Sequence, residues 1–295
     1  MVGPGFDVVA IPGLSVVAEH YDAFILDLWG VIHDGAVAYP HAAATLKRLK
    51  EAGKRTILLS NAPRRTRNLI DGMQRMGLSR FLYDDILSSG EAINVAMRSR
   101  GDPFYADLGQ RCWHLGPERD RSVFEGLDVA LVASPEEATF VVNTGPWEFH
   151  ETVADYEMRL LRCRHRDLPM VCANPDHVVI REGRRVMCAG ALAARYEALG
   201  GRVSSRGKPD PAIYDLCLER LGGPDRKRVL AVGDALETDI AGASAAGLDA
   251  VFVTCGVHGA ELGTGYNEPA DPARIAALLA RHHLRCRAVL SAFIW

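Results

Sequence analysis

Short apolar runs alternate with amphipathic segments along the chain. The first apolar run, at residues 23–30, is followed at 40–53 by a segment whose leucines recur at helical spacing and which ends in basic residues and a glycine. A second run at 55–61 precedes a similar segment at 64–77. Apolar runs between turn signals are typical of buried strands, and the 3.6-residue period is typical of helices. The pattern therefore predicts a strand–helix–strand–helix unit in a parallel sheet.

The same alternation returns near the end of the chain, after a long interruption. A helical segment at 211–221 precedes a second strand–loop–helix–strand pattern. The interruption has strand-like and helical segments of its own and is too long for a loop, which indicates an inserted domain. We expect an α/β fold with a doubly wound, Rossmann-like parallel-sheet core formed by residues 1–87 and 202–295, and an inserted α/β domain at 88–201. The sequence at 272–295 predicts a helix followed by an apolar end, which we expect to pack on the core or on a second subunit.

Composition narrows the kind of partner to expect. Of the 295 residues, 48% are hydrophobic and 24% are charged, and the net charge is −3. No apolar stretch reaches the roughly 20 residues of a membrane-spanning helix, and so small a charge does not attract nucleic acid or an acidic membrane. We therefore expect a small diffusible ligand, with no nucleic acid and no membrane as partner.

Two further features bear on the location of the protein. The first residues carry Asp7 and no cationic start before their apolar positions, which is unlike a secretory signal. The seven cysteines are scattered and show no C-x-x-C spacing, so neither a disulfide framework nor a zinc site is predicted. We expect a cytoplasmic protein with reduced thiols.

Polar residues follow several of the predicted strands. They are Asp27, Ser60, Asn61, Lys208, Asp234 and Asp239. Each alone has an ordinary explanation as a capping, turn or solvated residue. If the strands are neighbours in one parallel sheet, however, all six residues meet at its carboxyl edge, where ligands bind in open α/β sheets. Carboxylates beside a lysine and hydroxyl or amide groups predict a site for a metal ion and a phosphate.

These residues lie in four ordered motifs: DLWGV, LLSNAPRR, RGKPDP and GDALETDIAGASAAGL. Together the motifs resemble those of the haloacid dehalogenase superfamily. The insert, with ANPD at 173–176 and CAGAL at 188–192, is similar to that of the class IIA members, which include 4-nitrophenylphosphatases and sugar or nucleotide phosphatases. The resemblance covers residues 23–257. It implies a core with an inserted α/β cap and Mg²⁺-dependent hydrolysis of a small phosphate monoester.

The resemblance also implies catalytic roles for three of the residues. Asp27 would attack phosphorus and become an aspartyl phosphate. Ser60, supported by Asn61, would hold a phosphoryl oxygen. Lys208 would pair with the nucleophile and stabilise the transferring group.

The remaining roles concern the metal ion and the substrate. By resemblance, Mg²⁺ would be bound by Asp27, Asp234 and the backbone carbonyl of Trp29, with Asp239 as a further ligand or as a partner that orients Lys208. The substrate would also contact Trp29 and Gly30 in the core, and Asn174 and Asp176 in the cap. The resemblance leaves the oligomeric state open and allows a homodimer.

One position departs from the family pattern. Phosphatases of the family carry a second Asp two residues after the nucleophile, which protonates the leaving oxygen and then activates water, and here that residue is Trp29. An indole can do neither, and a positioned acid or base is worth about 10² to 10⁴ in rate. His33 and Asp34 could reach the site from a flap, or they could simply form a turn.

This departure leaves two alternatives to a phosphatase. One is a non-phosphatase hydrolase of the dehalogenase type, which would leave Asp234 unexplained. The other is a phosphometabolite-binding protein with little turnover. The charged segments at 118–122 and 181–185 are expected to be solvated faces or hairpin tips, although the first could contact a ligand of the cap.

Overall fold

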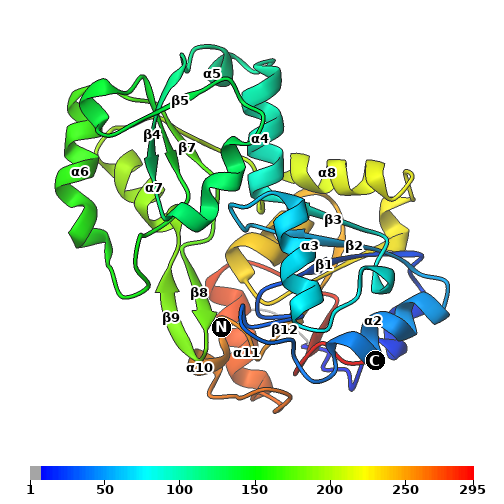
Figure 1. The fold of residues 1–295 in the computed structure, drawn as a ribbon. Coiled ribbons are helices and arrows are strands. Elements are labelled where there is room, and N and C mark those ends of the chain that lie inside the picture. The colour runs from blue at the N-terminus through cyan, green and yellow to red at the C-terminus, as the bar shows by residue number, and fades with distance from the viewer. Residues whose placement is uncertain (1–7) are drawn as a thin grey trace.

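Two parallel sheets organise the molecule into two lobes (Figure 1). The structure is a computed structural model that describes residues 8–295, so residues 1–7 of the predicted core lie outside the described part. The six-stranded sheet of the first lobe has the order β13-β12-β11-β1-β2-β3. Its strands are β1 (Ala23–Asp27), β2 (Arg55–Ser60), β3 (Asp85–Ser88), β11 (Val229–Gly233), β12 (Asp249–Val253) and β13 (Ala288–Leu290).

Helices cover both faces of this sheet. Phe24 and Leu26 of β1 belong to one apolar cluster, with residues of α2 and α3, whereas Ile25 belongs to a second cluster, with residues of α8, α9 and α11. Alternate residues of a strand point to opposite faces, so β1 is buried throughout and is apolar up to its last residue. The helices are α2 (Ala42–Glu51), α3 (Thr66–Arg75), α8 (Pro211–Arg220), α9 (Ala241–Ala245) and α11 (Pro272–Arg281). This arrangement confirms the predicted doubly wound α/β core.

The second lobe, which we call the cap, is built on a five-stranded parallel sheet. Its order is β10-β7-β6-β4-β5. The strands are β4 (Arg111–Leu115), β5 (Ala130–Val132), β6 (Phe140–Asn143), β7 (Met170–Cys172) and β10 (Val203–Ser205). The helices of this part of the chain are α4 (Ser89–Ser99), α5 (Pro103–Ala106), α6 (Val153–His165) and α7 (Ala189–Ala198).

The predicted limits of the insert differ slightly from those of this sheet. Ser88, placed in the insert by the sequence, pairs with Ser60 in the core sheet. At the other end, β10 follows the predicted boundary at 201 and pairs with β7 of the cap sheet. Both strands are short, so their local pattern does not reveal which sheet they join.

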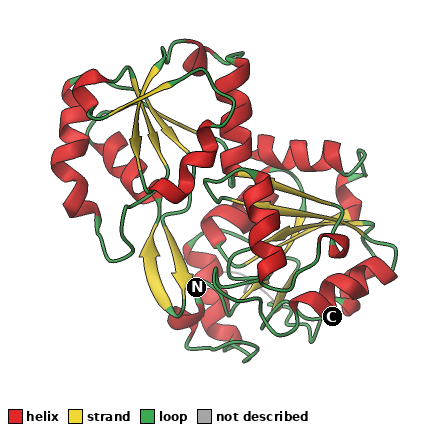
Figure 2. Cartoon of the chain, viewed as in Figure 1, coloured by secondary structure: helices red, strands yellow, loops and turns green. Residues whose placement is uncertain are grey.

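An antiparallel hairpin extends from the cap toward the core (Figure 2). It consists of β8 (Val178–Arg181) and β9 (Arg184–Met187), joined by Glu182 and Gly183. Both joining residues have positive φ, 49° and 74°, as a tight two-residue hairpin turn requires. The hairpin brings cap residues close to the loop that follows β1.

The tail packs on the core of its own chain. It contains α11, as expected, and also β13, which the sequence did not reveal and which pairs with β12 at the sheet edge. Phe293 follows in the core, 1% exposed.

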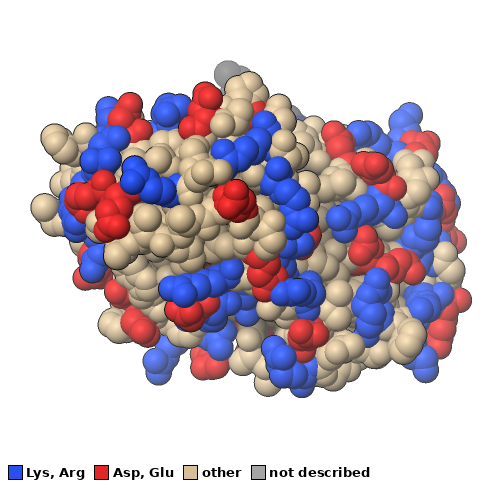
Figure 3. Space-filling model, turned by 45° about the horizontal axis from the view of Figure 1, so that its top comes forward, with Lys and Arg blue, Asp and Glu red and all other residues tan. Residues whose placement is uncertain are grey.

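The charge distribution on the surface and the character of the helices relate to the expectation that neither nucleic acid nor a membrane is a partner. Lys and Arg side chains alternate with Asp and Glu side chains over the face drawn in Figure 3. Within residues 8–295, none of the helices has the length and apolar character needed to cross a membrane.

Candidate active site

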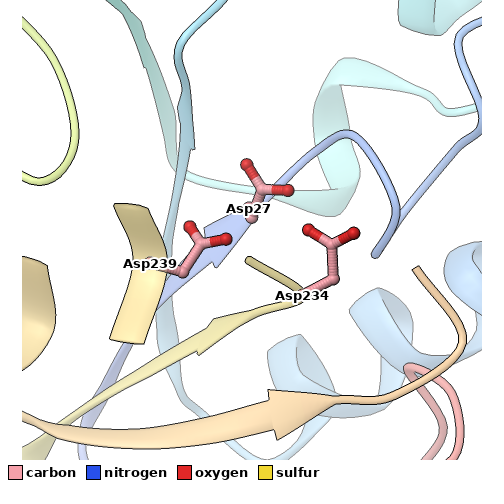
Figure 4. Close-up of side chains that lie close together, drawn as sticks. All are labelled: Asp27, Asp234 and Asp239. Atoms are coloured by element: carbon pink, nitrogen blue, oxygen red, sulfur yellow. The ribbon is translucent and has the colours of Figure 1, made fainter. Parts of the chain in front are cut away.

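Three carboxylates meet at the carboxyl edge of the core sheet (Figure 4). Asp27 is the last residue of β1, and Asp234 directly follows β11, its neighbour in the sheet. Asp239 lies in the turn of π-helix at Leu236–Ile240. One oxygen from each carboxylate lies within 4.8 Å of the others, and all three residues are buried. The topology thus brings together residues that are more than 200 positions apart in the chain.

Lys208 joins two of these carboxylates. Its Nζ donates hydrogen bonds to Oδ1 of Asp27 and, at 2.6 Å, to Oδ1 of Asp239. Burial alone would lower the pKa of Lys208, but the two carboxylates outweigh it and raise that pKa well above its usual range. Lys208 is therefore a fixed positive charge beside Asp27.

One ammonium group does not balance three carboxylates. Burial, and then the charge of Asp239, raises the pKa of Asp234 to about 8. Burial also raises the pKa of Asp27 well above its usual range, against the opposing effect of Lys208. Three buried carboxylates with one lysine leave an excess of negative charge that a divalent cation would neutralise, and hard oxygen donors suit Mg²⁺. The donor set therefore fits the expected ion.

The backbone around Asp234 is tightly shaped. Val257 donates its N–H to Oδ2 of Asp234 at 2.6 Å. A Cβ atom on Gly30 or Gly256 would lie 2.0 or 1.9 Å from that same oxygen. Gly30 also has a φ of +84°. Only glycine lets these two loops approach the carboxylate so closely.

Asn61, next to Ser60 at the end of β2, connects the core to Lys208 and to the cap. Its Oδ1 accepts the backbone N–H of Lys208 at 2.8 Å, and its Nδ2 donates to the backbone carbonyl of Lys208 at 3.0 Å. The same Nδ2 donates to Oδ1 of Asp176 at 2.8 Å. Asn174 shapes the cap loop by accepting the backbone N–H of Asp176 at 3.0 Å. All of these residues line one cavity, together with Ser60.

The side chain of Trp29 is directed to the cap. Its indole N–H donates to the backbone carbonyl of Ile180 in β8 at 2.7 Å. A Cβ atom on Gly35 would lie 2.2 Å from the indole ring, so the loop after β1 closes tightly around it. Trp29 lines the cavity, but its one polar hydrogen is already donated to the hairpin.

Neither of the two suggested substitutes for the acid lines this cavity. His33 is buried, and burial lowers its pKa to about 4. Its Nδ1 accepts the N–H of Gly35 at 3.0 Å. Asp34 accepts the N–H groups of Ala36 and Val37 at 2.9 and 2.8 Å. Both side chains therefore stabilise the turn.

Sequence comparison places the chain among known proteins. A family model of haloacid dehalogenase-like hydrolases matches residues 24–130, and a second, described as HAD-hydrolase-like, matches 205–281. Chronophin from Bos taurus is 30% identical over 265 residues, which cover 86% of this chain and 88% of chronophin. The chain belongs to the haloacid dehalogenase-like hydrolase family.

Solved structures agree with this assignment. A haloacid dehalogenase-like hydrolase from Brucella suis 1330 is 36% identical to the present chain, with a TM-score of 0.82. The match covers 96% of the present chain and 100% of the Brucella chain. The 4-nitrophenylphosphatase from Thermotoga maritima is 25% identical, with a TM-score of 0.68, over 94% of this hydrolase and 96% of its own chain. The resemblance to class IIA members is confirmed.

The cavity of this hydrolase contains residues that sequence reasoning did not assign to the site. It has a volume of about 280 Å³ and lies between the sheet edge and the cap. Besides the expected residues, it is lined by Arg64, Arg119, Asp120, Phe149 and Arg181. The expectation that 181–185 is only a solvated hairpin tip was wrong for Arg181, because the hairpin folds toward the core. In 118–122, Glu118, Arg119 and Arg121 are exposed as expected, whereas Asp120 is buried, and Arg119 and Asp120 line the cavity. Their charged sequences carry no signal that distinguishes a cavity wall from an exposed surface.

Proposed function

We propose that this hydrolase is a Mg²⁺-dependent phosphatase that acts on a small phosphate monoester through an aspartyl phosphate at Asp27. One observation carries the proposal: Asp27 lies at the floor of the cavity, buried, hydrogen-bonded to Lys208 and within 4.8 Å of two further carboxylates. Relatives named chronophin, glycerol-3-phosphate phosphatase and 4-nitrophenylphosphatase support the same class of substrate.

In the first step, Asp27 attacks phosphorus. Lys208 binds Oδ1, so we assign the attack to Oδ2 of the same carboxylate. The new O–P bond forms as the bond from phosphorus to the leaving oxygen breaks, and that oxygen takes up a proton from a water molecule. Ser60 would donate its hydroxyl hydrogen to a phosphoryl oxygen, and Lys208 would offset the charge of the equatorial oxygens.

In the second step, water hydrolyses the aspartyl phosphate and returns Asp27 and inorganic phosphate. The acid or base that would assist both steps is absent at position 29. The first step should therefore depend strongly on how well the alcohol leaves, and the second should be slow.

Mg²⁺ would be held by Asp27, Asp234, Asp239 and the backbone carbonyl of Trp29. When bound, it supplies positive charge that draws the phosphoryl group to Asp27 and stabilises the transition state. Asp239 would at the same time keep Lys208 oriented through its hydrogen bond.

The size of the cavity supports a small ligand. At about 280 Å³ it suits a metabolite rather than a polymer. We propose a phosphorylated metabolite as the partner and the cytoplasm as the location.

The proposal is tested by phosphate release. Sugar, nucleotide, alkyl and aryl phosphates would be incubated with the wild type and with Asp27→Asn, with and without Mg²⁺. We expect release from at least one class with Mg²⁺, and loss of release in Asp27→Asn or without the ion. No release from any member, or equal release by Asp27→Asn, would contradict the proposal; stabilisation by a phosphate ligand without release would instead indicate a binding protein.

A further inference from the structure

Two arginines of the cap share one aromatic ring at the wall of the cavity. The guanidinium carbon of Arg119 lies 4.6 Å from the centre of the Phe149 ring, and that of Arg181 lies 4.8 Å from it. Because both distances are measured to the same ring centre, the separation of the two guanidinium carbons cannot exceed their sum. All three side chains line the same cavity as Asp27.

These arginines lack the strong partners that neutralise others in the molecule. Arg65, for example, is bound by both oxygens of Glu91 at 2.6 and 2.8 Å. Among residues 8–295, by contrast, the Arg119 side chain has no hydrogen bond and no ion pair. In the same part of the chain, the polar contacts of Arg181 are long, 3.5 Å to the carbonyl of Gly35 and 3.9 Å to Glu182.

The surrounding charges do not compensate for the pair. A third guanidinium, that of Arg64, also lines the cavity, and its Nε is buried without a hydrogen-bond partner. Asp120 is the buried carboxylate beside it, with Oδ1 at 3.4 Å from Arg64 Nε. Three guanidinium groups therefore face one buried carboxylate at this part of the wall.

Arg119 and Arg181 belong to the cap, and Arg64 lies in the core loop between β2 and α3. The phosphoryl site lies at the sheet edge of the core. Because Asp27 fixes phosphorus at the floor, a substrate would direct its leaving group, not its phosphoryl group, toward the cap. Guanidinium groups form paired hydrogen bonds with carboxylates and phosphates, and stacking on an aromatic ring restricts their motion before a ligand binds.

We propose that Arg119 and Arg181, held on Phe149, bind a second acidic group in the leaving part of the substrate. The substrate class is then a small phosphate monoester that also carries a carboxylate or a second phosphate. This inference rests on the proposed phosphatase function and narrows it.

A matched pair of ligands tests the proposal. Ethyl phosphate ends in a methyl group where 2-phosphoglycolate has a carboxylate. Propyl phosphate and 3-phosphonooxypropanoate differ in the same way and have one more carbon atom between the phosphate and the variable group. For each pair, kcat/KM would be measured with Mg²⁺ in the wild type, Arg119→Gln, Arg181→Gln and the double variant. Dissociation constants would be measured by calorimetry in the Asp27→Asn background, where no turnover disturbs binding.

We expect the wild type to prefer the carboxylate member of at least one pair. Each single substitution should lower that preference roughly tenfold or more, as a hydrogen bond to a charged group predicts. The matched control is Arg159→Gln, because Arg159 also lies over an aromatic ring of the cap, 4.9 Å from Trp147, but does not line the cavity. Comparing variants cancels the intrinsic difference in leaving-group reactivity.

Equal binding of both members by the wild type, or a preference that both arginine variants retain, would overturn the proposal. Release of phosphate from alkyl phosphates without any preference would overturn this inference and leave the phosphatase function standing. Failure to release phosphate from every ligand would instead contradict the phosphatase function, and the dissociation constants would still decide whether the arginine pair binds a second acidic group.

Discussion

The indole N–H of Trp29 donates a 2.7 Å hydrogen bond to the backbone carbonyl of Ile180, which joins the loop after β1 to the cap hairpin. The resemblance to family phosphatases would place an acid at this position. In this hydrolase the same position instead connects the two domains beside the nucleophile. Trp29 therefore joins the cap hairpin to the core next to the nucleophile.

Replacing the indole of Trp29 with a phenyl ring should loosen the hairpin. Trp29→Phe retains a six-membered aromatic ring but removes the five-membered ring with its N–H, and so leaves the Ile180 carbonyl without its donor. A hydrogen bond of about 1 kcal/mol changes an open-to-closed ratio about fivefold, so amide hydrogen exchange across 178–187 should accelerate by roughly that factor. Trp147→Phe, at a tryptophan within the cap, serves as the control, and equal exchange in wild type and Trp29→Phe would show that the bond does not hold the hairpin.

Restoring an acid at position 29 should change which substrates react. An aryl phosphate has a good leaving group and needs little protonation, whereas an alkyl phosphate needs an acid. Trp29→Asp should therefore raise the steady-state rate on alkyl phosphates by about 10²-fold or more. It should affect the rate on aryl phosphates much less. If the wild type already hydrolyses alkyl phosphates at ordinary enzyme rates and Trp29→Asp is slower, another residue supplies the acid.

Mg²⁺ should stabilise the fold through Asp234. The ion relieves repulsion among the three buried carboxylates, so it should raise the melting temperature of the wild type. Asp234→Asn removes one ligand and should abolish most of that increase. Asp215→Asn, at an exposed residue that pairs with Arg226, is the matched control and should keep it. A titration that is the same in Asp234→Asn and in the wild type would remove Asp234 from the metal site.

Asp120 should make stability depend on pH. Burial raises its pKa to about 6, against the opposing effect of Arg64. A carboxyl whose pKa is raised on folding stabilises the fold fully below its unfolded pKa, near 4, and this contribution is lost as pH rises through 6. Asp120→Asn has no carboxyl at this position and so does not lose this contribution as pH rises. The free energy of unfolding of Asp120→Asn minus that of the wild type should therefore increase by up to about 3 kcal/mol from pH 4 to pH 7.5. Urea denaturation at both pH values measures this difference. A difference that is the same at both pH values would contradict the prediction.

The sequence by itself determined the core architecture and the residues at its edge. Asp27 and Ser60 end apolar runs that can only be buried strands in an alternating α/β pattern, and parallel strands present their carboxyl ends on one side. The meeting of Asp27 with Asp234 followed from that rule. The four motifs also sufficed to indicate the family, because they occur together and in order along the chain, whereas any one of them alone would be a weak signal.

Tertiary structure decided the cap side of the site and the weak strands. The strands β3, β10 and β13 have only three or four residues and lie at sheet edges, so their local sequence did not show which sheet they join. Arg119, Phe149 and Arg181 come from three separate segments of the cap, which only its tertiary fold brings together. Charged residues look alike in sequence whether they face solvent or a cavity, because burial and charge balance depend on which distant segments pack around them.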